Sequence, residues 1–320
     1  MSEPVMSRSG EAADEAALRI ALAQGDAALG TIGPVLGHLL ANGDHSLFTD
    51  EIVSRVRGMV ADLARQLLAA QARAAGEAEP PTLDDASCAP LTAALLADGR
   101  LVAHCHALAI EWQLTARLET RSAIDPVLSP LLQALIASDD PSTAATAMAT
   151  LAAQARFVQR QRRMELPLEE LPADHFHRAL ATWLDRTAAS EGEAAGQAAA
   201  ALREAYDESA SRLGLLARLV HTMGAGALAA LSIGHAGAAI FLTALAATSQ
   251  CDRETAVLAT SEGQATRLAL SLRAAGAPPR TIEEQFLHIH PDIAPPAGLD
   301  DIGPSRAQAL LGASRTAPGT

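Results

Sequence analysis

The chain has 320 residues, a net charge of −13 at pH 7 and a pI near 5.2. Hydrophobic residues make up 49% of it, which is enough to bury a core and excludes an intrinsically disordered chain. The acidic charge and an aromatic content of 2% argue against nucleic-acid binding, because phosphates need a basic face and unstacked bases need aromatic side chains.

The composition predicts an all-α fold. Ala and Leu, which favour helices, supply most of the apolar content, whereas the β-branched and aromatic residues that favour strands are scarce. All 24 basic residues are Arg. The absence of Lys excludes a Schiff-base lysine, a phosphate-loop lysine and a Ser-Lys dyad.

The N-terminal part is expected to begin with disorder and then become helical. Residues 1–10 are polar and form no apolar stripe, so we predict that they are disordered. The clearest helix covers residues 49–76, with Thr49 as its N-cap and Gly76 at its C-terminal stop. Its apolar stripe has steps of three and four residues and consists of Ile52, Val56, Met59, Val60, Leu63 and Leu67.

Between residues 90 and 165 the periodicity predicts four more helices. A helix, a turn at "ADGR" and a second helix come first, followed by two helices joined at "SDDPS", where Ser142 or a nearby residue would be the cap and Pro141 the breaker. The expected buried face of the second helix consists of Leu101, Cys105, Leu108 and Trp112.

The segment "RFVQRQRRME" gathers positive charge in an otherwise acidic chain. The guanidinium groups belong to Arg156, Arg160, Arg162 and Arg163. A solvated helix face is the preferred interpretation. The functional alternative is a patch that binds an anion or an acidic partner, because guanidinium groups suit carboxylate and phosphate.

Residues 222–248 are the one stretch that could cross a membrane, since His235 is their only ionisable group. Ala and Gly supply most of the hydrophobicity, and no basic cluster or aromatic belt flanks the stretch. We therefore predict two close-packed buried helices, broken around Gly234–Gly237, and no membrane association.

The C-terminal part ends in an irregular way. "RTIEEQFLHIHP" predicts a helix that starts at a capping box of Thr281 and Glu284 and ends at Pro291. The predicted organisation is a disordered stretch (1–10), an N-terminal helical region (11–165), a C-terminal helical region (166–296), and a short helix with a loose tail (297–320).

Short polar turns recur after apolar helices, at "LLANGD", "LLADGR" and "LIASDD". Helix, turn and helix is the unit of an α-solenoid. We therefore expect an irregular multi-helix bundle or HEAT-like α-solenoid of about ten to twelve helices.

Residues 238–287, with the run "RLALSLRAAGAPP" and the preceding "LTALA", resemble the C-terminal part of an uncharacterised alphaproteobacterial helical-repeat family. The resemblance covers less than a quarter of the chain. It implies HEAT-like helices and carries no assigned activity or site.

Six of the ten histidines lie in three His-x-His triplets, which raises the question of a metal site. Residues i and i+2 of a helix point about 200° apart, so His104 and His106 should diverge around Cys105. His175 and His177 are likewise helical and are expected at the margins of a buried Phe176. His288 and His290 are the metal candidates, because the following proline favours an extended conformation in which the two rings could converge.

No catalytic constellation is recognisable. The three cysteines form no CxxC pair, there is no GxSxG motif, and the N-terminus lacks a signal-peptide pattern. We therefore expect a cytoplasmic bacterial protein-interaction or adaptor module without catalytic activity or cofactor. Its partner would be an unknown protein, with homo-oligomerisation left open. The alternative is a helical-bundle enzyme that binds a metal or small ligand through its C-terminal histidines.

Overall fold

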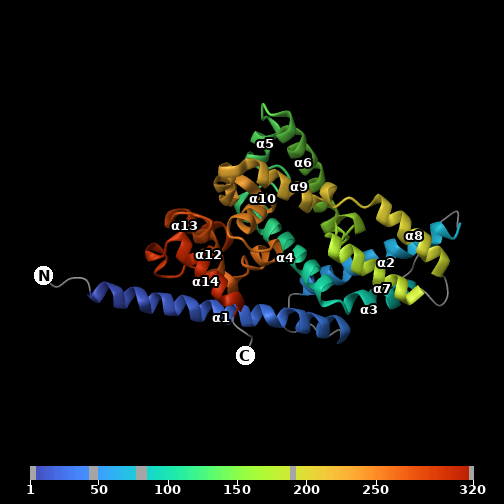
Figure 1. The fold of residues 1–320 in the computed structure, drawn as a ribbon, viewed down its shortest axis with the longest axis horizontal. Coiled ribbons are helices and arrows are strands. Elements are labelled where there is room, and N and C mark those ends of the chain that lie inside the picture. The colour runs from blue at the N-terminus through green and yellow to red at the C-terminus, as the bar shows by residue number, and fades with distance from the viewer. Residues whose placement is uncertain (1–4, 43–49, 77–84, 188–191, 317–320) are drawn as a thin grey trace. The chain divides into compact units, whose positions relative to one another are not determined.

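A computed structural model describes residues 5–42, 50–76, 85–187 and 192–316. Every regular element in these ranges is helical, which confirms the all-α class (Figure 1). The α-helices are α1 (Val5–Asn42), α2 (Asp50–Ala74), α3 (Asp85–Leu96), α4 (Gly99–Ser122), α5 (Pro130–Ile136), α6 (Pro141–Arg162), α7 (Ala173–Thr187), α8 (Gly192–Ala205), α9 (Arg212–Met223), α10 (Ile233–Thr248), α11 (Arg253–Leu258), α12 (Ala265–Ala274), α13 (Pro279–Ile289) and α14 (Pro304–Thr316). The 3-10 helices are η1 (Leu168–Glu170), η2 (Glu208–Ala210), η3 (Gly224–Leu231), η4 (Glu262–Gln264) and η5 (Leu299–Asp301).

The chain forms two compact units that are each discontinuous in sequence. Unit 1 consists of Met1–Ile32, Ile110–Leu151 and Leu216–Thr320, and unit 2 consists of Gly33–Ala109 and Ala152–Leu215. The sequence predicted two helical regions that are each continuous in the chain, 11–165 and 166–296. That division stays a prediction. Residues 5–10, expected to be disordered, already belong to helix α1.

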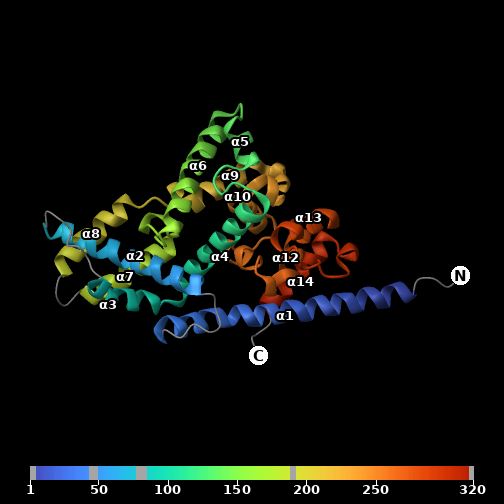
Figure 2. The ribbon, with the colours of Figure 1, turned by 180° about the vertical axis from the view of Figure 1, so that it is seen from behind.

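Unit 2 is built around α2. Its predicted stripe from Ile52 to Leu67 is buried, as expected, and α2 packs against α3 and α8 while α7 packs against α3 and α8. Both ribbon views show these four helices side by side (Figure 1, Figure 2). The core includes Trp183 of α7, which is fully buried and donates its indole N–H to Gln71 Oε1 of α2 at 3.0 Å.

Unit 1 packs α10 against α5, α11 and α13, and α12 against α13 and α14. The first part of α1 belongs to this unit. Gln264 Nε2 donates to the Gly25 carbonyl at 2.7 Å, and Arg267 forms an ion pair with Asp26. The buried Glu111 of α4 and the partly buried Arg253 of α11 make a further ion pair inside the unit.

Of two predicted helix caps, one agrees with the structure and one is wrong. The cap of α6, expected at Ser142 or a nearby residue, is Asp140, because its carboxylate accepts from the Thr143 amide at 2.9 Å and from the Ser142 hydroxyl at 2.7 Å. Hydrogen bonds, first of all from the Thr143 side chain, lower the pKa of Asp140 to about 2. The predicted capping box at Thr281 is wrong, because helix α13 already begins at Pro279. Proline suits the first turn of a helix because it has no backbone N–H that would need a hydrogen-bond acceptor.

The apolar segment 222–248 follows the prediction in its second half only. Residues 236–246 are buried, and Gly237 breaks the helix with φ 70° and ψ 165°. The first half is the 3-10 helix η3, in which residues 224–226 and Leu228 are exposed. The stretch is therefore not two buried α-helices. A positive φ of 51° at Gly224 accounts for the end of α9 at that point.

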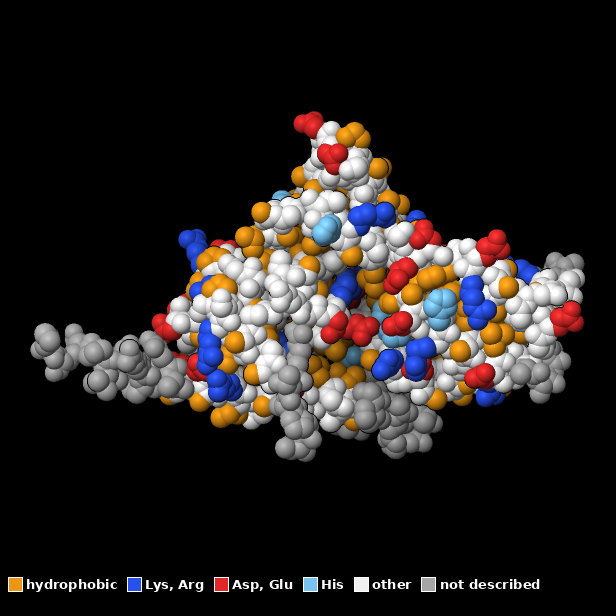
Figure 3. Space-filling view, viewed as in Figure 1, with side chains coloured by type: hydrophobic (Ala, Val, Ile, Leu, Met, Phe, Trp, Pro, Cys, Tyr) orange, Lys and Arg blue, Asp and Glu red, His pale blue; other side chains and the backbone are white. Residues whose placement is uncertain are grey.

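One continuous helical stretch of the described residues, Arg212–Leu231, could cross a membrane by length and composition alone. One third of that stretch, 33%, is buried inside the protein. The bent helix pair Ala86–Leu96 and Gly99–Ser122 passes the same test only if both helices count as one span. Arg and acidic side chains are interspersed over the face drawn in Figure 3.

Candidate functional site

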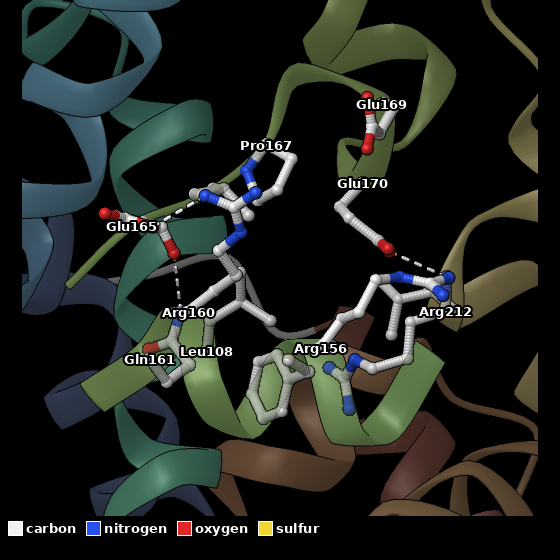
Figure 4. Close-up of a pocket in the computed structure, with 12 residues that line it drawn as sticks. Leu108, Arg156, Arg160, Gln161, Glu165, Pro167, Glu169, Glu170 and Arg212 are labelled. Atoms are coloured by element: carbon white, nitrogen blue, oxygen red, sulfur yellow. Dashed lines mark hydrogen bonds and ion pairs between the residues drawn. The ribbon is translucent and has the colours of Figure 1, made fainter. Parts of the chain in front are cut away.

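An open pocket lies within unit 2 and encloses about 490 Å³ of space that no protein atom fills, part of it solvent. Its residues come from four places in the chain: α4, α6, the α6–α7 connection (residues 163–172) and the start of α9 (Figure 4). They are Leu108, Arg156, Phe157, Arg160, Gln161, Glu165, Leu166, Pro167, Glu169, Glu170, Arg212 and Leu213.

The α6–α7 connection is held against α2 by two polar side chains. Asp62 Oδ2 accepts from the Leu166 amide at 3.1 Å, and Gln66 Oε1 accepts from the Leu168 amide at 2.9 Å. Gln66 Nε2 also donates to the Leu166 carbonyl at 2.9 Å. The connection has few backbone hydrogen bonds of its own, and these side chains of α2 supply partners for its amide and carbonyl groups. They therefore fix the connection as a wall of the pocket. Burial raises the pKa of the Asp62 carboxyl above its usual range.

A glycine lets this segment approach α2 closely. A Cβ on Gly58 would lie 2.7 Å from Met164 Cβ, which is too close for any real side chain. Met164 itself has a positive φ of 58°, so the backbone turns sharply as it leaves α6. Tyr206 secures the far end of the segment, because its hydroxyl donates to the Leu171 carbonyl at 2.7 Å.

Arg212 forms a rigid part of the pocket wall. It is 2% exposed, its guanidinium carbon lies 3.6 Å from the centre of the Phe157 ring, and its Nη1 donates to Gln154 Oε1 at 3.2 Å. The stack is a cation–π contact, which keeps the guanidinium flat against the ring. The backbone amide of Arg212 donates to Glu170 Oε2 at 2.7 Å and so holds that carboxylate in place (Figure 4).

Two charged groups of the pocket neutralise each other. Arg160 Nη1 lies 2.7 Å from Glu165 Oε2, and this hydrogen bond raises the pKa of the guanidinium. Arg156 and Glu169 are exposed, and neither makes a hydrogen bond or ion pair to any residue that the structure describes. The pocket lining therefore contains apolar side chains together with one cation, Arg156, and one carboxylate, Glu169, that form no ion pair with the described residues.

The structure divides the predicted arginine patch. Arg156 and Arg160 line the pocket, whereas Arg162 and Arg163 are exposed elsewhere and do not line it. The patch as a whole is thus not one surface. Half of it belongs to a concave site, and the other half is a solvated helix end.

The metal candidates His288 and His290 contact different elements of unit 1. His288 Nδ1 lies 3.3 Å from Ser122 Oγ of α4. His290 is 3% exposed, its ring packs edge-on against Phe286 at 5.9 Å, and its Nε2 has no hydrogen-bond partner among the described residues.

Burial lowers the pKa of His290, and the positive charge of Arg117 lowers it further. The same charge opposes a metal cation at this ring. Within the described ranges, no three donor atoms that include either His288 or His290 lie close enough together to hold a metal. The metal site therefore stays a prediction that lacks a third ligand.

The histidines of α4 do diverge around Cys105, but both are buried: His104 is 2% exposed and His106 is 3% exposed. Both rings lie in the interior because this part of α4 is covered on all sides. His104 stacks on His175 of α7 with ring centres 4.9 Å apart. His221 and His235 are both exposed.

Acid should destabilise the protein through His106. Burial lowers the pKa of this side chain to about 4, against 6.5 in an unfolded chain. Between these values the unfolded chain takes up a proton that the folded chain excludes, so stability falls as the pH drops from 6.5 to 4. The loss is about 3 kcal/mol, at about 1.4 kcal/mol per pH unit.

Urea unfolding of the full chain at pH 7 and pH 4.5 measures this loss. His106→Leu should reduce the difference between the two pH values, whereas His177→Leu, at an exposed position of α7, should leave it unchanged. An undiminished acid effect in His106→Leu would show that another group is responsible.

Sequence reasoning missed Phe157, Glu165, Glu170 and Arg212 as site residues. The only local signal was the acidic pair in "ELPLEELP", between two prolines that mark an irregular segment. Arg212 lies 42 residues from its partner Glu170, and no pattern in the sequence connects the two.

No protein-family model matches the chain. No curated protein matches it either. The search of solved structures likewise returned no match. The pocket must therefore be interpreted from its own geometry, and the resemblance of residues 238–287 to a helical-repeat family stays a prediction.

Proposed function

We propose that this protein acts by binding, as an interaction or adaptor module without catalytic chemistry, and that its unit 2 pocket receives an acidic, partly apolar segment of a partner protein. The observation that carries the proposal is Arg156. It is a guanidinium at the wall of a pocket with no ion pair to the described residues, beside apolar side chains of α4, α6 and α9.

The surroundings of Arg156 support an acidic ligand. Arg212 adds a second fixed positive charge, and its stack on Phe157 leaves little side-chain freedom to lose on binding. Guanidinium groups bind carboxylates through parallel hydrogen bonds. The apolar lining, which includes Leu108, Leu166 and Leu213, offers a surface for a neighbouring apolar side chain.

Binding is favoured over catalysis by what the pocket contains. Its lining has guanidinium, carboxylate, amide and apolar groups, and none of the twelve lining residues is a Ser, Cys, Thr, Lys or His. A hydroxyl, thiol or amine nucleophile is therefore missing from this site. HEAT-like helix pairs and a cytoplasmic location remain parts of the proposal that rest on the sequence.

The test uses the full-length protein and a fluorescein-labelled peptide of alternating Leu and Asp residues with a free amino terminus. Fluorescence anisotropy should show binding, and Arg156→Gln should weaken it about tenfold, equivalent to about 1.4 kcal/mol. Arg163→Gln is the matched control, because it removes the same charge from the same segment outside the pocket. It should change the affinity less than twofold.

A peptide with Asn in place of Asp completes the experiment. It should bind the wild type weakly and should not distinguish Arg156→Gln from the wild type. Equal affinity of the Asp and Asn peptides, or equal effects of the two Arg substitutions, would contradict the proposal.

A further inference from the structure

The pocket is electrically balanced, although the chain as a whole is acidic. Three guanidinium groups and three carboxylates line it. Arg160 and Glu165 form an ion pair at 2.7 Å, and the Glu170 carboxylate accepts the amide of Arg212. The side chains of Arg156 of α6 and Glu169 of η1, one of each sign, form no hydrogen bond or ion pair to the described residues.

A ligand that is only acidic would satisfy Arg156 and would meet Glu169 as a repulsive charge. A ligand with an ammonium group and a carboxylate would satisfy both, because each charge would find an unpaired opposite. The carboxylate of Glu170, the next residue in the chain after Glu169, is directed toward Arg212 instead (Figure 4).

We infer that the pocket captures the free amino terminus of a partner chain, in which an apolar first residue is followed by acidic residues. The α-ammonium group binds at Glu169, the first side chain packs on the apolar lining near Phe157, and an acidic side chain binds Arg156. This inference rests on the proposed function and adds the chemistry of the partner segment.

A chain terminus fits better than an internal lysine. The α-ammonium is attached directly to the backbone beside the first side chain, so charge and apolar group are held close together. A lysine carries its ammonium on a flexible four-carbon stem, and fixing that stem costs about 2 kcal/mol of side-chain entropy.

The experiment compares the labelled Leu-Asp peptide with its N-acetylated form on the full-length protein, by fluorescence anisotropy at pH 7. Acetylation removes the positive charge and leaves the rest of the peptide unchanged. Wild-type protein should bind the acetylated form about tenfold more weakly. Glu169→Gln should reduce this preference to less than threefold, mainly by weakening the free-terminus peptide.

Glu204→Gln is the matched control, because Glu204 is exposed on α8 in the same unit and does not line the pocket. It should keep the full preference. Both substitutions lie at exposed positions, so the protein is expected to fold in each case.

Equal binding of the free and acetylated peptides would overturn the inference, and so would an unchanged preference in Glu169→Gln. The proposed function would survive either result if Asp-to-Asn replacement in the peptide still weakened binding through Arg156. It would fail together with the inference if that replacement had no effect.

Discussion

Replacing Glu111 with alanine should destabilise the protein by about 3–5 kcal/mol, because it leaves a charged partner without compensation in the protein interior. Glu111 is fully buried, and both of its carboxylate oxygens accept from the Arg253 guanidinium at 2.8 Å. Arg253 Nε also donates to Thr243 Oγ1 at 3.1 Å, which joins α4, α10 and α11 through one cation. Urea unfolding followed by circular dichroism measures the loss.

Glu119→Ala is the control, since Glu119 is exposed on the same helix and its removal should cost less than about 0.5 kcal/mol. The double variant Glu111→Leu with Arg253→Met should be less destabilised than either single change, because both desolvated charges disappear together. A Glu111→Ala variant within about 1 kcal/mol of the wild type would show that this ion pair does not stabilise unit 1.

Trp183→Ala should have a comparable effect in unit 2, about 3–5 kcal/mol, as is usual when a buried aromatic side chain is truncated. The indole is 0% exposed in the core formed with α2 and donates to Gln71 Oε1. Thermal and urea unfolding of the variant should both show the loss.

Trp183→Phe separates the two contributions of the indole. It keeps an aromatic ring in the core and removes the hydrogen bond, so it should cost only about 1–2 kcal/mol. If Trp183→Phe were as unstable as Trp183→Ala, the hydrogen bond rather than the packing would dominate, contrary to the burial of the ring.

The parts of the fold that follow from local periodicity could be predicted. The stripe of α2 from Ile52 to Leu67 is buried as the steps of three and four residues required, and Phe176 and Trp183 form the core face of α7. The break at Gly237 was also predictable, because only glycine adopts its φ of 70° at little cost.

Helix α4 shows where periodicity fails. The pattern assumes one buried face, yet residues 104–109 are buried on all sides, and this is why His104 and His106 are both in the interior. Trp112, expected in the core, is half-buried instead. A helix surrounded by neighbours has no polar face that could reveal its orientation.

The pocket could not be predicted because it depends on contacts between distant parts of the chain. Arg156 and Arg160 were recognised as a charged patch, but their separation from Arg162 and Arg163 depends on where α6 ends and how the α6–α7 connection turns back. That turn requires Gly58 of α2, about 100 residues earlier, to leave room for Met164. No local pattern encodes such a pairing.

The binding proposal is tested most directly by reversing the charge on both sides of the contact. Arg156→Glu should lose binding of the Leu-Asp peptide and should gain binding of the same peptide with Lys in place of Asp, while Arg163→Glu should keep the wild-type preference for Asp. Anisotropy titrations of the three proteins with the two peptides give the comparison. If Arg156→Glu and Arg163→Glu showed the same preference as the wild type, Arg156 would not contact the ligand and the proposed function would be wrong.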